Sequence, residues 1–149
     1  MTAFRFPLQR ALDWRRTQLE LAEARVEQQL AALAAIDRAS VELLSIGQRA
    51  ETEVRRFPGM VGQDLSTLGS FRVALKTRAR DLASRREECR KELSARQAAV
   101  LEARRRYRLL ERLKERRWAE WQSAAERELD ELAADSYLAQ WARRQISSL

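Results

Sequence analysis

Arginines crowd the stretch RRRYRLLERLKERR, residues 104 to 117, which is the part of the sequence best suited to bind a charged partner. Eight of its fourteen residues are Arg or Lys, and only Glu111 and Glu115 are acidic. On a helix, like charges spaced four residues apart, such as Arg108 and Arg112, repel one another. A face that only meets water more often mixes the two signs of charge. The run, together with a net charge of +7, therefore indicates a surface for an acidic partner.

Tryptophans accompany this charge toward the two ends of the sequence. They are Trp14, Trp118, Trp121 and Trp141. Two explanations fit them. Either they fill a helix seam where its repeat weakens, or they are exposed anchors for a partner, a role in which Trp and Arg are both common.

Residues for catalysis are scarce. The sequence contains no His, the commonest general base and metal ligand. It also lacks a GxxxxGK[ST] phosphate loop and a cluster of metal-binding residues. Its one cysteine, Cys89, excludes an internal disulfide and fits a reduced compartment. We predict a protein that is not an enzyme and that binds no metal or cofactor.

The elements that carry these residues are expected to be helices. Three of the four glycines and one of the two prolines fall in FPGMVGQDLSTLGS, residues 57 to 70, and helix formers dominate elsewhere. We predict an all-α fold in which two long helices form one antiparallel coiled-coil hairpin, a single domain over residues 1–149. Helix one covers about residues 8–57, the connection about 58–64, and helix two about 65–146.

Heptad spacing supports this hairpin. With position a at Leu12, eleven of the sixteen a and d positions from Arg5 to Phe57 are apolar. Helix two repeats the pattern as far as Leu110, after which the apolar stripe shifts. Polar residues interrupt the seam at Arg15, Gln29, Arg72 and Arg86. These interruptions fit either a closed hairpin or further association of hairpins.

Helix lengths place the basic run near the chain ends. At about 1.5 Å per residue, helix one would be about 75 Å long and helix two about 120 Å. Roughly the last thirty residues would then extend past the start of helix one by the same rise.

No segment approaches the ~20 consecutive apolar residues that cross a bilayer. The first residues, MTAFRFPLQRALDWRR, lack the apolar region of a secretory signal. The expectation is a cytoplasmic protein.

Two stretches resemble the FliJ family, the small coiled-coil proteins of the flagellar type III export apparatus. The first is FRFPLQRALDWRRTQLELAEARVEQQLAAL, with Phe4, Phe6, Leu8 and Leu12 in an F-x-F-x-L-x-x-x-L pattern. The second is LLERLKERRWAEWQSAAERELDELA, with its L-x-x-L-K-E-R, aromatic and E-x-x-L-D-E pattern. The resemblance covers almost the whole chain.

The resemblance implies a hairpin similar to the central stalk subunit of rotary ATPases. It implies that the terminal end of the hairpin enters the pore of the hexameric flagellar export ATPase. Partners further implied are the cytoplasmic domain of the export gate and the export chaperones, with a position peripheral to the cytoplasmic face of the inner membrane. The candidate ATPase-binding residues are Arg10, Arg16, Arg112, Arg116, Arg117 and Trp121.

The resemblance also implies a gate-binding site early in helix two. The matching positions are Phe71, Leu75, Arg78 and Leu82. Phe71 and Leu75 fit the family pattern, whereas Arg78 and Leu82 replace its small and polar residues. Simple packing in the seam is the competing explanation for Leu75 and Leu82.

Two other functions compete with a role in protein export. A basic helix is the usual footprint of a nucleic-acid-binding protein, although no recognised DNA- or RNA-binding motif is present and nucleic acid is not the expected partner. A purely structural coiled coil that forms homo-oligomers is the third class.

Overall fold

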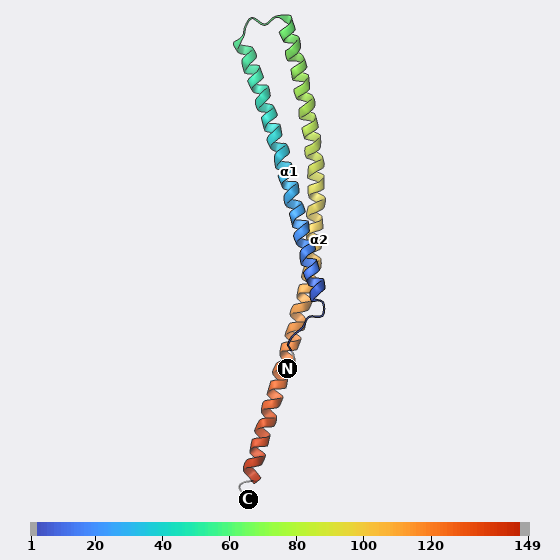
Figure 1. Ribbon diagram of the computed structural model, residues 1–149, viewed down its shortest axis with the longest axis vertical. Helices are drawn as coiled ribbons and strands as arrows, with labels where there is room; N and C mark the ends of the chain where they lie inside the picture. Colours follow the sequence, from blue (N-terminus) through green and yellow to red (C-terminus); the bar gives the residue numbers. More distant parts are fainter. Residues whose placement is uncertain (1–2, 147–149) are drawn as a thin grey trace. The chain divides into compact units, whose positions relative to one another are not determined.

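Two helices make up nearly all of the computed structural model, which describes residues 3–146. Helix α1 spans Gln9–Arg56 and helix α2 spans Gly62–Ile146 (Figure 1). No strand occurs in the described range. The predicted all-α helical hairpin is therefore confirmed.

Proline residues set both ends of α1 close to the predicted positions. Pro7 precedes the helix, and its first turn closes through the Gln9 N–H, which donates to the Phe6 carbonyl at 3.1 Å. At the other end, Pro58 restricts Phe57 to extended backbone and has no N–H for a further helical bond. The helix thus ends at Arg56, one residue before the predicted end.

Helix α2 begins at Gly62, three residues before the predicted start at residue 65. The cause is a local cap. The Asp64 carboxylate accepts a hydrogen bond from the Val61 N–H at 3.3 Å, and the Asp64 N–H donates to the Val61 carbonyl at 2.9 Å. An acidic side chain at the third helical position stabilises the first turn through the N-cap N–H and the helix dipole.

The chain divides into two compact units. The terminal unit consists of Met1–Gln18 and Arg104–Leu149, of which residues 3–18 and 104–146 are described. The central unit is Leu19–Ala103 and contains the connection between the helices. Each unit includes a piece of both helices, and the prediction of a single domain over residues 1–149 stays a prediction.

Within the central unit the two helices lie side by side and run antiparallel (Figure 1). Gln29 meets Cys89, and Asp37, two turns further along α1, meets Arg86, which lies earlier on α2. Contacts that advance along α1 and retreat along α2 are the mark of an antiparallel pair.

The buried contact of this seam is polar. Gln29 and Cys89 are each only 7% exposed. The Gln29 side-chain amide donates to the Cys89 carbonyl at 3.1 Å, and its nitrogen lies 3.0 Å from the Cys89 Sγ. Both residues occupy predicted seam positions, so the amide that interrupts the apolar pattern is satisfied by the opposite helix.

Two arginines on the seam also reach across to α1. Arg86 donates to the Asp37 carboxylate at 2.6 Å, and Arg96 donates to the Arg25 carbonyl at 3.1 Å. Arg72, by contrast, is exposed. Gln29, Arg86 and Arg96 thus have partners on the opposite helix of the same chain, and further association of hairpins stays an open alternative.

The heptad assignment agrees with burial along α1. Every predicted seam residue from Leu12 to Val54 is at least partly buried, whereas Arg5, Leu8 and Phe57 are exposed. The predicted repeat therefore fails only at its two ends, at positions that lie outside helix α1.

Replacing Gly47 with alanine should stabilise the hairpin. A Cβ at this position would lie 3.5 Å from the Leu75 Cδ1, an ordinary van der Waals distance. Because Ala is about 0.8–1.0 kcal/mol more favourable than Gly inside a helix, we expect Gly47→Ala to raise the free energy of unfolding by about 1 kcal/mol. Urea denaturation followed by circular dichroism measures it.

Gly69→Ala is the matched control, because nothing lies within 4 Å of a Cβ at this helical position. The Gly69→Ala protein should gain only the stabilisation that comes from the higher helix propensity of alanine. A Gly47→Ala protein less stable than wild type would contradict the packing described around Leu75.

Candidate binding surfaces

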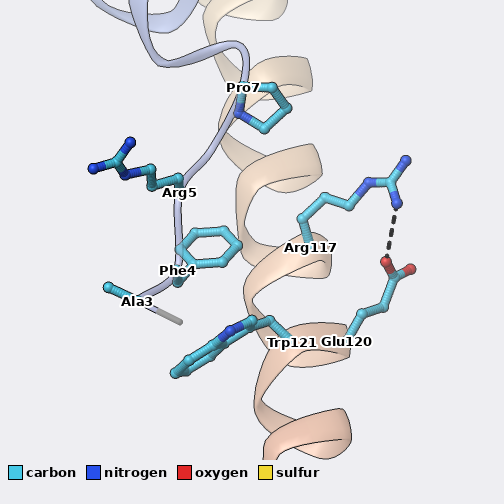
Figure 2. A pocket seen from close by; sticks show the side chains of 7 residues that line it. All are labelled: Ala3, Phe4, Arg5, Pro7, Arg117, Glu120 and Trp121. Carbon is cyan, nitrogen blue, oxygen red and sulfur yellow. Dashed lines mark hydrogen bonds and ion pairs between the residues drawn. The ribbon is translucent and has the colours of Figure 1, made fainter. Parts of the chain in front are cut away.

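In the terminal unit, residues 3–8 precede α1 and lie against α2 (Figure 2). Phe6 is only 8% exposed, so this N-terminal strap is packed. The Phe4 ring faces Trp121, with the two ring centroids 6.0 Å apart and the planes at 52°. Such a tilted aromatic pair contributes about 0.5–1.5 kcal/mol beyond the area it buries.

The strap and α2 enclose an open cleft of about 1010 Å³, which we name the terminal cleft. Its lining residues are Ala3, Phe4, Arg5, Pro7, Arg117, Glu120 and Trp121. Figure 2 shows the aromatic pair between the strap and the helix, with Arg117 paired to Glu120 at 3.4 Å. An aromatic floor beside two guanidinium groups suits a partner segment with an apolar side chain next to an acidic one.

A second surface of the terminal unit is a row of arginines. Arg105, Arg108, Arg112 and Arg116 follow one another at spacings of 3, 4 and 4, which places them on one side of α2. All four are exposed, and none forms an ion pair with another residue of the 3–146 range. We name this row the basic stripe. It concentrates charge where the sequence predicted a surface for an acidic partner.

The predicted ATPase-binding residues are divided between these surfaces. Arg117 and Trp121 line the terminal cleft, whereas Arg112 and Arg116 lie in the basic stripe. Arg10 is exposed on α1 and lines neither surface.

Arg16 belongs to the packing of the terminal unit. Its guanidinium lies over the Tyr107 ring, 5.8 Å from the centroid, and donates to the Tyr107 hydroxyl at 3.1 Å. The Tyr107 hydroxyl in turn donates to Glu111 at 3.2 Å. Arg16 therefore fastens α1 to α2, in addition to any contact with a partner.

Sequence reasoning did not include the strap in the site. Phe4, Arg5 and Pro7 line the cleft but lie before the first helix, and of the three only Arg5 falls on a predicted seam position. The sequence feature that could have indicated the strap is the pair of aromatic residues Phe4 and Phe6, which precede Pro7 and the start of the helix.

The four tryptophans differ in exposure, which bears on the two explanations for them: filling of the helix seam or contact with a partner. Trp121 is half-buried against Phe4. Trp14, Trp118 and Trp141 are exposed, and Trp14 is covered on one face by the Arg15 guanidinium at 4.7 Å. Trp121 thus fits the packing explanation, whereas the other three fill no seam within the described chain.

Beyond Ala125 the shifted apolar stripe of α2 is uncovered. Ala125 is buried, whereas every described residue from 126 to 146 is exposed. The large apolar side chains in this tail are Leu129, Leu132, Tyr137, Leu138, Trp141 and Ile146. The apolar stripe that shifts after Leu110 is therefore not buried by any described residue beyond Ala125.

The four predicted gate-binding residues line one groove of the central unit. Phe71, Leu75, Arg78 and Leu82 form its α2 side, and its volume is about 380 Å³. The other lining residues are Ala39, Glu42, Leu43, Ile46 and Ala74. Leu75 and Leu82 are half-buried and Phe71 and Arg78 are exposed, so the residues that pack the seam also form the floor of the groove.

No protein-family model, curated protein or solved structure matches this chain. Neither helix, as far as residues 3–146 are concerned, has a stretch apolar enough to span a lipid bilayer.

Removing the Phe4 ring should expose Trp121 to solvent. In a background where Trp14, Trp118 and Trp141 are replaced by Phe, Trp121 is the sole reporter. Because the aromatic contact contributes about 0.5–1.5 kcal/mol, we expect Phe4→Ala to release the strap for a larger fraction of the time. Acrylamide quenching of Trp121 should become about twofold stronger if the strap covers one side of the ring.

Leu8→Ala is the control, because Leu8 lies in the same strap but is exposed. Equal quenching in the Phe4→Ala and parent proteins would show that the strap does not cover Trp121 in solution.

Proposed function

We propose that this chain is a non-enzymatic, stalk-like component of a flagellar type III protein export apparatus. In this role it binds the hexameric export ATPase, promotes the assembly and activity of the ring, and couples it to the export gate and to export chaperones. It would work at the cytoplasmic face of the inner membrane, peripherally, through the apparatus.

The basic stripe carries this proposal, together with the resemblance of the two end segments to the FliJ family. Four exposed arginines without ion-pair partners in the described chain offer charge-assisted hydrogen bonds to carboxylates. The planar guanidinium is suited to bidentate contacts that fix orientation as well as add affinity. An acidic loop of a protein ring is a partner of this chemistry.

The terminal cleft supports a second contact with the same partner. Its aromatic pair is the kind of anchor that dominates protein interfaces, and Arg117 lies at its edge. In the proposed complex the stripe steers and orients the ring subunits, and the cleft holds an apolar side chain.

Charge reversal in the stripe tests the proposal. Purified wild-type protein should stimulate ATP hydrolysis by the export ATPase of the same organism. In Arg112→Glu/Arg116→Glu, repulsion replaces attraction at two adjacent turns, and stimulation should be lost, with the rate falling to that of the ATPase alone. Phosphate release measures the rate, and sedimentation measures the complex.

Arg90→Glu/Lys91→Glu is the matched control, because these two basic residues are exposed in the central unit and line neither surface. The control should stimulate as wild type does. If wild-type protein forms no complex with the ATPase and does not stimulate it, the proposal fails. Nanomolar, strongly salt-dependent binding to nucleic acid in place of the ATPase would favour the competing function.

The groove of the central unit is the proposed contact with the gate. Phe71→Ala removes the exposed aromatic side chain at its edge and should weaken binding of the cytoplasmic gate domain about tenfold or more, as for an aromatic anchor. Val73→Ala serves as control, because Val73 is exposed on the same helix but does not line the groove. Titration calorimetry with equal effects from both variants would contradict this use of the groove.

A further inference from the structure

Large apolar side chains are exposed where the two helices of the central unit are connected. Phe57 is 63% exposed, Val61 69% and Leu65 55%. Pro58 and Gly59 lie between them in the sequence and are also exposed. We name residues 57–65 the hairpin tip. Neighbouring apolar side chains of this size that stay in water commonly mark a contact with another molecule or a membrane.

The backbone of the tip holds these side chains in place. The Phe57 N–H donates to the Val54 carbonyl at 3.4 Å, and the Asp64 carboxylate accepts from the Val61 N–H. The Leu65 N–H also donates to the Val61 carbonyl at 3.3 Å. The apolar side chains are therefore presented by a capped helix start, and little ordering remains to be done on binding.

Basic residues flank the tip on both helices. α1 ends in Arg55 and Arg56, and Arg56 lies 3.8 Å from Glu53. On α2, Arg72, Lys76 and Arg80 are spaced four residues apart, are exposed, and form no ion pair with a described residue.

The basic residues of α2 share a side of the helix with Leu65, one of the apolar residues of the tip. Leu65 lies seven residues before Arg72, which is two helical turns, so Leu65 and the basic row face the same way. Residues 66–80 include no acidic residue, and the Asp64 carboxylate is engaged by the backbone of the tip. The α2 side of the tip thus has an apolar group at its end and positive charge behind it, whereas on α1 Glu53 pairs with Arg56 and Glu51 is exposed.

We propose that the hairpin tip docks on an anionic lipid surface. Phe57, Val61 and Leu65 enter the boundary between headgroups and acyl chains. Arg55, Arg72, Lys76 and Arg80 meet lipid phosphates, their aliphatic stems lying along the apolar boundary. Binding by shallow apolar insertion plus basic residues needs no membrane-spanning segment.

Charge favours lipid over a second copy of the chain. Two tips brought together would place their basic rows near one another, whereas an anionic bilayer neutralises them. The proposal does not depend on export ATPase binding, because the stripe and the terminal cleft belong to the other unit. Either proposal can fail alone.

Vesicle flotation with the full-length protein tests this docking. Vesicles with about 30% phosphatidylglycerol should bind the protein about tenfold or more tightly than pure phosphatidylcholine vesicles, because of the basic row. Raising the salt from about 0.05 M to about 0.5 M should weaken binding severalfold, because screening shortens the reach of the charges.

Two variants separate the contributions of the tip. Phe57→Ser/Val61→Ser/Leu65→Ser should lower binding to anionic vesicles about tenfold, because the inserted apolar area is lost. Arg72→Gln/Lys76→Gln/Arg80→Gln should lower it by a similar factor and remove the preference for anionic lipid. Because all six side chains are exposed, circular dichroism should show both variants as helical as wild type.

The controls use equally exposed residues elsewhere. Val41→Ser/Leu44→Ser/Leu101→Ser removes three exposed apolar side chains away from the tip, and Arg105→Gln/Arg108→Gln/Arg112→Gln removes charge from the basic stripe. Both should bind anionic vesicles as wild type does.

Three results would overturn the docking. One is the absence of binding to anionic vesicles at low salt, which leaves a protein as the partner of the tip. Another is loss of binding in the stripe variant but not in the tip variants. The third is a dimer, seen by light scattering without vesicles, that the serine tip variant abolishes.

Discussion

The buried amide of Gln29 is the contact on which the rest of the hairpin depends. Two helices without a third layer leave a narrow core, and none of the described side chains is completely buried. Apolar seam residues of similar size tolerate a slip by one heptad, because Leu, Ile and Val replace one another there. Gln29 does not, since a slip by one heptad would place the bulkier Leu82 or Arg96 opposite it in place of Cys89. The larger side chain would hold the amide away from the helix carbonyl, and an unsatisfied buried amide costs about 1–3 kcal/mol. Polar seam residues commonly set register in this way.

A fixed register determines which surfaces the central unit can present. With Gln29 on Cys89, and Asp37 on Arg86 at 2.6 Å, the α1 side chains around Leu43 are brought opposite those around Leu75. The groove is built from this pairing, so its shape is a consequence of contacts several turns away. The same register leaves the connection short, and Phe57 has no helix to pack against.

Heptad spacing predicted the helices, and every seam position that it assigned within α1 is at least partly buried, because burial in a two-helix fold follows periodicity. It did not predict the start of α2, where one carboxylate, Asp64, adds a turn that no periodic pattern reveals. Arg86 interrupts the apolar pattern of the sequence, and the pattern could not show its partner because Asp37 lies 49 residues away. The strap was missed for a related reason: Phe4 meets Trp121 through tertiary contact, and no local rule connects them.

The basic stripe is under strain that binding would relieve. Arg108, Arg112 and Arg116 stand at successive i, i+4 positions, and each such like-charge pair destabilises a helix by about 0.2–0.5 kcal/mol. Arg16 over Tyr107, and Phe4 against Trp121, hold this part of α2 from its other side and offset the repulsion. A partner that brings carboxylates to the stripe removes the repulsion and adds attraction. The basic stripe, where like-charge repulsion destabilises α2, is thus the part of the helix that an acidic partner would stabilise most.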